Sequence, residues 1–184
     1  MRQFIQRLFG IIASPPPPAE KPADTGKLAD TEKPAGLNEF SKEVLDIVAA
    51  EFPDFLQWQV EDPENPDVLC LKIAAPNDQI ASPLTIGTWD NEITILYDAY
   101  HQHLRAESLR QDIAEAITLA NDFMTNKLLL GIFIKNHTWV GTTLISDIHQ
   151  LSEASFYRPT PPCEIEIRSW DGSLDQRLNL DESL

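Results

Sequence analysis

Basic side chains are scarce in this chain. Its 184 residues include 14 lysines and arginines against 29 aspartates and glutamates, so the formal net charge is −15 at pH 7. A surface that binds nucleic acid needs patches of lysine and arginine to neutralise phosphates, and we therefore expect no nucleic-acid partner. The acidic excess favours basic proteins as partners instead, chiefly because it speeds their encounter.

Cysteine and glycine are also rare, with two and seven residues. Cys70 and Cys163 each lie in an apolar or alternating run, which predicts two buried thiols in a bacterial cytoplasmic chain; a single disulfide is the alternative. The sequence has no glycine-rich phosphate loop and no serine at a strand–turn–helix elbow. Asp62 and Glu64 form a carboxylate pair, but their proline-rich turn predicts solvated loop charges. No motif establishes a reaction, so we expect a non-enzymatic protein without a cofactor.

Long apolar runs are missing as well, including at the N-terminus. Residues 1–14 repeat apolar side chains at steps of three and four, which predicts an amphipathic helix. The segment is too short to cross a bilayer, which takes about 20 apolar residues, and Arg7 interrupts it too early for a secretory signal. Three interpretations stay open for this helix: it lies on a membrane surface, docks into a partner's groove, or folds back on its own domain.

Proline and alanine dominate residues 15–36, where almost nothing is available to bury. Four consecutive prolines favour polyproline II, so we predict an extended, disordered linker. The remaining residues, 37–184, contain 25 acidic and nine basic side chains, a net charge of −16. The acidity therefore belongs to the predicted folded domain.

Residues 37–184 alternate between helical and strand periodicity. Apolar spacing predicts helices over 38–52, with Asn38 as N-cap and Pro53 as the stop, and over 106–126. Predicted strands cover 56–61, 68–75, two arms within 83–98, 128–136, 138–146, 163–170 and 173–180, with turns at Asp90-Asn91, Asn136-His137 and Asp171-Gly172. This order predicts an α+β fold in which an antiparallel sheet carries two helices packed on one face.

The stretch ITILYDAYHQHL contains two histidines two positions apart. If it stays extended, the period of two places His101 and His103 on the same face of the sheet. Two such ligands can bind zinc, but a site needs three or four. Asp98, His137 and His149 are candidates for the others, yet none has a spacing that ties it to the pair. We therefore predict no metal site, and a metal-assisted hydrolase that uses the two histidines with a carboxylate stays the alternative.

The stretch LTIGTWDNEITILYDAYHQHL, followed by an amphipathic helix, two strands and RSWDGSLD, resembles a group of small bacterial proteins. These proteins carry a strand that ends in an aromatic residue, His-x-His and an apolar residue, and they close with a Ser-Trp-x-Gly-x-x-Asp hairpin. The likeness covers roughly residues 38–180. The group usually reads Trp-His-x-His-Phe where this chain reads Tyr-His-Gln-His-Leu. The matching residues are Trp89, Glu92, Tyr100, His101, His103, Ser169, Trp170, Gly172 and Asp175.

Some members of that group resemble immunity proteins encoded beside secreted polymorphic toxins. The resemblance implies a binding protein that inhibits a basic toxin by steric and electrostatic occlusion; a scaffold or a membrane-tethered binding domain is a further alternative. Carboxylates and aromatic anchors near the hairpin ends are the expected partner contacts. These residues are Asp90, Glu92, Tyr97, Asp98, Tyr100, His101, His103, Asp171 and Asp175. The competing structural interpretation is that the histidines cap the strand and hydrogen-bond a carboxylate such as Asp98.

Overall fold

The computed structural model describes residues 36–146 and 163–180, all of which belong to the unit Pro34–Leu184. The predicted helix at 1–14 and nearly all of the predicted linker at 15–36 lie outside these residues. Within the part that is described, no helix combines the length and the apolar character needed to cross a membrane.

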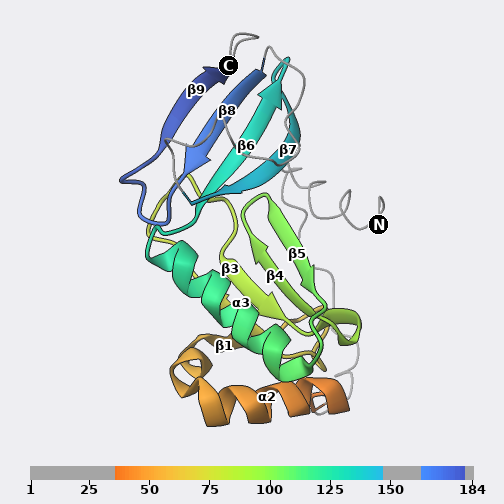
Figure 1. The fold of residues 1–184 in the computed structure, drawn as a ribbon. Coiled ribbons are helices and arrows are strands. Elements are labelled where there is room, and N and C mark those ends of the chain that lie inside the picture. The colour runs from red at the N-terminus through yellow and green to blue at the C-terminus, as the bar shows by residue number, and fades with distance from the viewer. Residues whose placement is uncertain (1–35, 147–162, 181–184) are drawn as a thin grey trace, which may run out of the picture. The chain divides into compact units, whose positions relative to one another are not determined.

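The described residues form an α+β fold with antiparallel strands, which confirms the predicted class (Figure 1). The strands are divided between two sheets, where the sequence led us to expect one. Sheet A has the order β1-β2-β3-β4-β5, formed by Gln59–Val60, Cys70–Ile73, Leu84–Gly87, Ile93–Tyr97 and Tyr100–Leu104. Sheet B has the order β7-β6-β8-β9, formed by Leu129–Lys135 (β6), Thr138–Ile145 (β7), Cys163–Arg168 (β8) and Gln176–Leu180 (β9).

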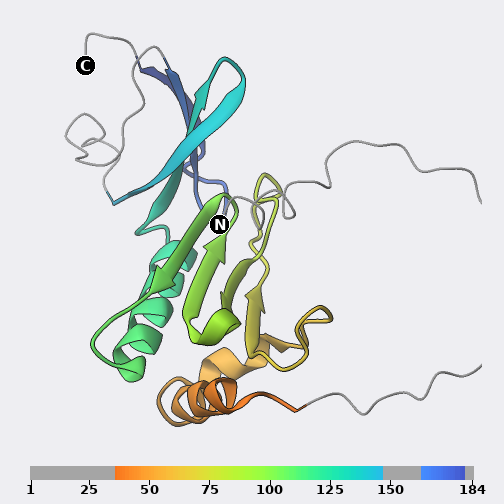
Figure 2. The same ribbon diagram turned by 90° about the vertical axis from the view of Figure 1, so that its right-hand side faces the viewer.

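Helix α2 (Glu39–Glu51) begins where the sequence predicts. The side-chain oxygen of Asn38 accepts a hydrogen bond from the Ser41 N–H at 2.8 Å, which confirms the N-cap. Helix α3 (Leu109–Met124) is capped in the same way by Ser108, which accepts from the Gln111 N–H. Figure 2 shows α3 along one face of sheet A, in agreement with its contacts to β4 and β5.

The predicted strand at 56–61 is wrong for most of its length. Pro53 begins a short 3-10 helix, η1 (Pro53–Trp58), and only Gln59–Val60 is extended. Phe55 is buried and its ring meets that of Trp58 edge-on, with 4.9 Å between ring centroids. A separation of three residues brings side chains together in a 3-10 turn, so the aromatic pair fits this conformation rather than a strand.

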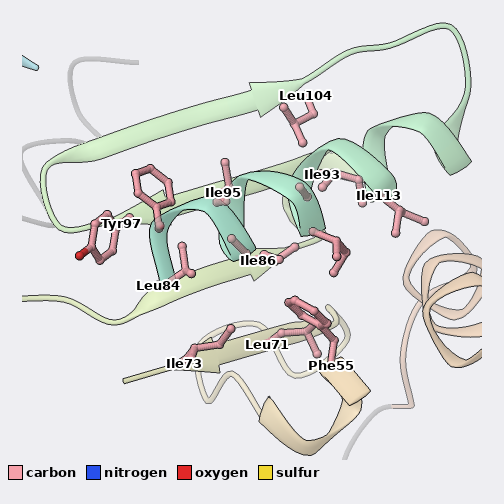
Figure 3. Close-up of a cluster of buried hydrophobic side chains, with 14 of the residues drawn as sticks. Phe55, Leu71, Ile73, Leu84, Ile86, Ile93, Ile95, Tyr97, Leu104 and Ile113 are labelled. Atoms are coloured by element: carbon pink, nitrogen blue, oxygen red, sulfur yellow. The ribbon is translucent and has the colours of Figure 1, made fainter. Parts of the chain in front are cut away.

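The larger core lies between sheet A and its helices (Figure 3). Leu71, Ile86 and Ile95 are paired across β2, β3 and β4, and all three are buried. Ile113 and Ile117 of α3 belong to the same cluster. Burying an aliphatic side chain of this size stabilises a fold by roughly 1.5–3 kcal/mol. Because these residues must face the core, the residues between them in each strand point to the opposite face of the sheet.

Sheet B carries a second, smaller cluster. Phe133, Ile165 and Leu178 are paired across β6, β8 and β9, and Cys163 is buried beside them. Cys70 is buried in sheet A, and both cysteines are free thiols, as predicted. The disulfide alternative is therefore wrong.

The predicted turns have the left-handed backbone that they require. Asp90 and Asn91 have φ values of 54° and 56°, and Asn136 and His137 have 51° and 61°. Gly172 has a φ of 79°, a conformation that glycine adopts without steric cost. These three turns set the direction in which the neighbouring strands return.

Candidate functional site

The two histidines lie on the face of sheet A opposite the larger core. The period of two in β4 and β5 places Thr94 opposite His103 and Leu96 opposite His101, on the face that does not carry Ile95. This confirms that the histidines share a face. We use the name histidine surface for Glu92, Thr94, Leu96, His101, His103 and Arg105.

Glu92 links two side chains of the histidine surface. Its Oε1 accepts from the Arg105 guanidinium at 2.6 Å, and its Oε2 lies 3.1 Å from His103 Nδ1. The Thr94 hydroxyl lies 3.0 Å from the same nitrogen. The contact with Glu92 is an ion pair only when the His103 ring is protonated, and the Thr94 hydroxyl donates to or accepts from Nδ1 according to the tautomer. The predicted bond from a histidine to Asp98 is wrong, since Glu92 occupies that role.

His101 packs against His103 rather than against a hydrogen-bonding partner. The two rings meet edge-on, with 4.4 Å between centroids. Burial, and secondarily the neighbouring His103, lowers the pKa of His101 below its usual value of 6.5. His101 is therefore neutral at pH 7, and the exposed end of β5 has no positive charge from this ring.

The position of the Trp89 side chain, next to this surface, is set by two contacts. A Cβ at Gly87 would lie 2.2 Å from the Trp89 ring, so the indole rests directly on the glycine backbone. The indole nitrogen donates to Asp62 Oδ2 at 3.3 Å. The prediction that Asp62 is a solvated loop charge is wrong, because Asp62 is buried. Burial raises the pKa of Asp62, but bonds from Glu64, Trp89 and Asn65 outweigh it and the net change is downward.

Asp98 lies at the turn between β4 and β5 and anchors that turn. Its carboxylate forms an ion pair with Arg168 of β8 and accepts from the Ala81 N–H. Only 7% of the Asp98 side chain is exposed. Asp98 thus connects sheet A to sheet B, and little of it is accessible to a partner.

Asp175 and Asp171 were also predicted to contact a partner, and both stabilise the loop that precedes β9. Asp175 accepts from the Ser169 N–H at 2.6 Å and from the Asn77 side chain at 2.9 Å. Asp171 accepts from Ser173 and from the Asn126 side chain at 2.9 Å. The bonds from Ser173 and Asn126 lower the pKa of Asp171 below its usual value. Both carboxylates organise the loop.

The predicted aromatic anchors differ in exposure. Tyr97 is only 1% exposed, and its ring lies 4.6 Å from Phe123 and 5.8 Å from Trp170 between centroids. Tyr100 is partly buried against Phe123, and its hydroxyl donates to Gln102. Tyr97 is therefore a core residue, whereas Tyr100 reaches the surface at the start of β5.

The strongest charge feature lies elsewhere, in residues 39–67, which we call the acidic segment. It holds nine carboxylates and one lysine, a net charge of −8, over α2, η1 and β1. Seven of these carboxylates are exposed and form no ion pair with any residue of 36–146 or 163–180: Glu39, Glu43, Asp46, Asp54, Glu61, Glu64 and Asp67. We did not predict this concentration, although a running count of charge along the chain would have shown it.

Metal binding has no geometric support in the described ranges. No three side chains of histidine, cysteine, aspartate or glutamate converge there in a way that could hold an ion.

Comparison with known proteins finds no family model, no curated protein and no solved structure that matches this chain.

Proposed function

We propose that this chain is a non-enzymatic binding protein, an immunity-type inhibitor that blocks a basic toxin by covering it with acidic surface. The observation that carries the proposal is the set of seven exposed, unpaired carboxylates in the acidic segment. Carboxylates that serve the fold are paired or hydrogen-bonded here, as with Asp98 and Asp175. The seven in the acidic segment have no such role, which leaves them available to a partner.

Apart from Glu39, which lies in the favourable first turn of α2, the exposed carboxylates of this segment do not assist folding. Glu51 lies in the last turn of α2, where no basic residue is present, and a negative charge at a helix C-terminus is unfavourable. Its pairing with Arg110 at 2.8 Å offsets part of that cost. Like charges along one exposed segment also repel each other. A function in partner binding gives a reason for retaining them.

The mechanism is occlusion with electrostatic steering. Complementary charge raises the association rate, while close packing at the interface determines how slowly the complex dissociates. No cofactor is needed.

We expect the protein to act in the cytoplasm, with any attachment to a membrane depending on residues 1–14. A cell fractionation that compares the full chain with a chain lacking those residues tests this expectation.

A co-expression growth assay tests the proposal. Cells that produce a basic toxin encoded next to this gene should survive when the chain is co-produced. Glu43→Lys with Asp46→Lys reverses two exposed charges of the acidic segment, and we expect protection to be lost. The matched control, Asp78→Lys with Glu107→Lys, makes the same change in net charge at two exposed positions outside the segment and should still protect. A lack of protection by the unmodified chain, together with no binding of the toxin, would contradict the proposal.

The metal-assisted hydrolase stays a prediction that no observation on the histidine surface favours. Metal analysis of chain purified without an affinity tag tests it directly. About one tightly held ion per chain, lost when His101 and His103 are both replaced by alanine, would support the hydrolase over the binding protein.

A further inference from the structure

Within residues 36–146 and 163–180, strand β5 forms one edge of sheet A and pairs only with β4. An edge strand presents unpaired backbone N–H and C=O groups, and proteins usually protect such edges with lysine, proline or a bulge. The sequence of β5, YHQHL, contains no proline and no lysine, arginine, aspartate or glutamate. The opposite edge of the sheet, β1, is only two residues long. Of these two edges, β5 is therefore the one that can accept another strand.

The hairpin register identifies which backbone groups point outward. Tyr97 and Tyr100 close a two-residue turn, so this pair exchanges hydrogen bonds and the pairs then alternate along the ladder. Gln102 consequently bonds to β4, whereas the N–H and C=O of His101 and His103 point away from the sheet. Outside the helices and the strand ladders, no backbone hydrogen bond to either histidine is found among residues 36–146 and 163–180. The open edge is thus centred on the two histidines.

The side chains beside this edge differ between the two faces. On the helix side, Tyr100 packs against α3, and exposed Glu115 is close enough to contribute to the raised pKa of Tyr100, after the larger effect of burial. On the other side lie the rings of His101 and His103, of which His101 is neutral at pH 7. An added strand would therefore meet the Glu115 carboxylate on one face, and on the other face the two rings with the paired Glu92 and Arg105 beside them.

We infer that an extended, basic segment of the partner protein adds to sheet A as a further strand along β5. Main-chain hydrogen bonds to His101 and His103 supply affinity, and alternate side chains supply specificity, as in other cases of strand addition. Lysine or arginine of the partner lies near Glu115, and its neutral residues lie over the histidines.

The basic character of the partner rests on the proposed function, and the charge of the chain supports it. Residues 36–128, which contain sheet A, carry 17 acidic and five basic side chains, a net charge of −12. Strand β7 is also an uncharged edge, but the described part of sheet B has four acidic and three basic side chains, a net charge of −1. A basic strand is therefore drawn to β5 rather than to sheet B.

Synthetic peptides provide the probe. One ten-residue peptide alternates threonine with lysine, a second alternates threonine with glutamate, and a third is the lysine peptide N-methylated at every residue, which blocks both of its edges. We expect the lysine peptide to slow amide hydrogen exchange at His101 and His103 of the full chain, with little change at Gln102, which is already bonded to β4. The other two peptides should give no protection, because one is repelled and the other cannot form the ladder.

Substitutions at one position separate strand pairing from side-chain contact. His101→Pro removes the outward N–H, while His101→Ala removes the ring and keeps the N–H; a proline whose missing donor faces outward is tolerated on an edge strand. We expect the proline variant to bind the lysine peptide at least about tenfold more weakly than the alanine variant. Glu115→Lys should also weaken binding, whereas the control Glu61→Lys, at an exposed position next to the opposite edge strand β1, should weaken it less. Thermal melts of each variant show whether the fold is retained.

The results distinguish this inference from the proposed function. If the lysine peptide binds the proline and alanine variants equally, or binds without protecting the His101 amide, attraction is by charge alone and strand addition is wrong. If the lysine peptide does not bind at all, strand addition is also wrong. The growth assay decides the proposed function independently, because it measures protection by the whole chain against a whole toxin.

Discussion

Sheet A with its helices and sheet B differ in net charge and in how many of their charged side chains are paired. Residues 36–128 carry a net charge of −12, while the described part of sheet B, 129–146 and 163–180, carries −1. In sheet B, Arg177 pairs with Glu164 and Glu166, so its charges are used within the sheet. In the acidic segment most carboxylates have no such partner. The proposed binding function predicts such a difference, with unpaired charge in one region and charge paired within the fold in the other.

Breaking the ion pair between Asp98 and Arg168, which connects the two sheets, should lower the stability of the fold strongly. We expect Asp98→Ala to destabilise the fold by about 3 kcal/mol, because it removes two hydrogen bonds to a charged carboxylate, one from Arg168 and one from the Ala81 N–H. Arg168 keeps its ion pair with Glu166. Asp78→Ala, at an exposed position, should cost less than about 0.5 kcal/mol. Denaturant unfolding measures both. Equal stability of the two variants would mean that the connection between the sheets does not depend on this pair.

A second change tests the close contact between Trp89 and Gly87 within sheet A. We expect Gly87→Ala to cost about 1–3 kcal/mol, since the added methyl group overlaps the indole ring, and to shift Trp89 fluorescence as the ring moves. In a Trp89→Ala background the same substitution should cost much less. If the cost is the same in both backgrounds, the indole does not rest on the glycine as the structure shows.

Removing the Tyr97 hydroxyl should change stability less, and in the stabilising direction. The hydroxyl is buried and has no hydrogen-bond partner within the described residues. A buried polar group without a partner costs stability, so Tyr97→Phe should be neutral or stabilise the fold by up to about 1 kcal/mol. Tyr97→Ala, which also empties the space between Phe123 and Trp170, should cost about 3–5 kcal/mol. A clear loss of stability in the phenylalanine variant would show that a bound water satisfies the hydroxyl.

The smallest effect concerns pH at the histidine surface. The pKa of His101 is lower in the folded chain than in the unfolded chain, where it is about 6.5. Between these two values the unfolded chain binds more protons, so stability rises with pH and is lost on acidification below about 6.5. The size should be well under about 1 kcal/mol, because the ring is largely exposed. His101→Gln should flatten the unfolding free energy over this range, with no difference above pH 7, and an unchanged pH profile would contradict the assignment.

The sequence was sufficient for features that depend on neighbouring residues. The Asn38 cap needs only its own side chain and the next turn of α2, and the positive φ of Asp90 and Asn91 follows from the residue types that tolerate it. The common face of His101 and His103 follows from the period of two. Each of these rests on a separation of a few residues, where local geometry decides the outcome.

Features that depend on distant pairing could not be predicted. Glu92 reaches His103 only because the β4–β5 turn has two residues, and a shift of one residue in register would place the ring on the opposite face. The bond from Trp89 to Asp62 joins residues 27 positions apart and leaves no periodic signal. The strand order of sheet B depends on β8 pairing with β6 rather than β7, which strand periodicity does not specify.

The association rate with the toxin, measured against salt concentration, tests the central claim most directly. We expect a steep fall in the association rate constant between about 50 and 500 mM salt, as the Debye length shortens from about 14 to about 4 Å, with a smaller change in dissociation. Glu43→Lys with Asp46→Lys should lower the rate at low salt and flatten its dependence on salt. An association rate that is independent of salt, or that is unaffected by these two substitutions, would contradict the claim that the acidic segment directs recognition.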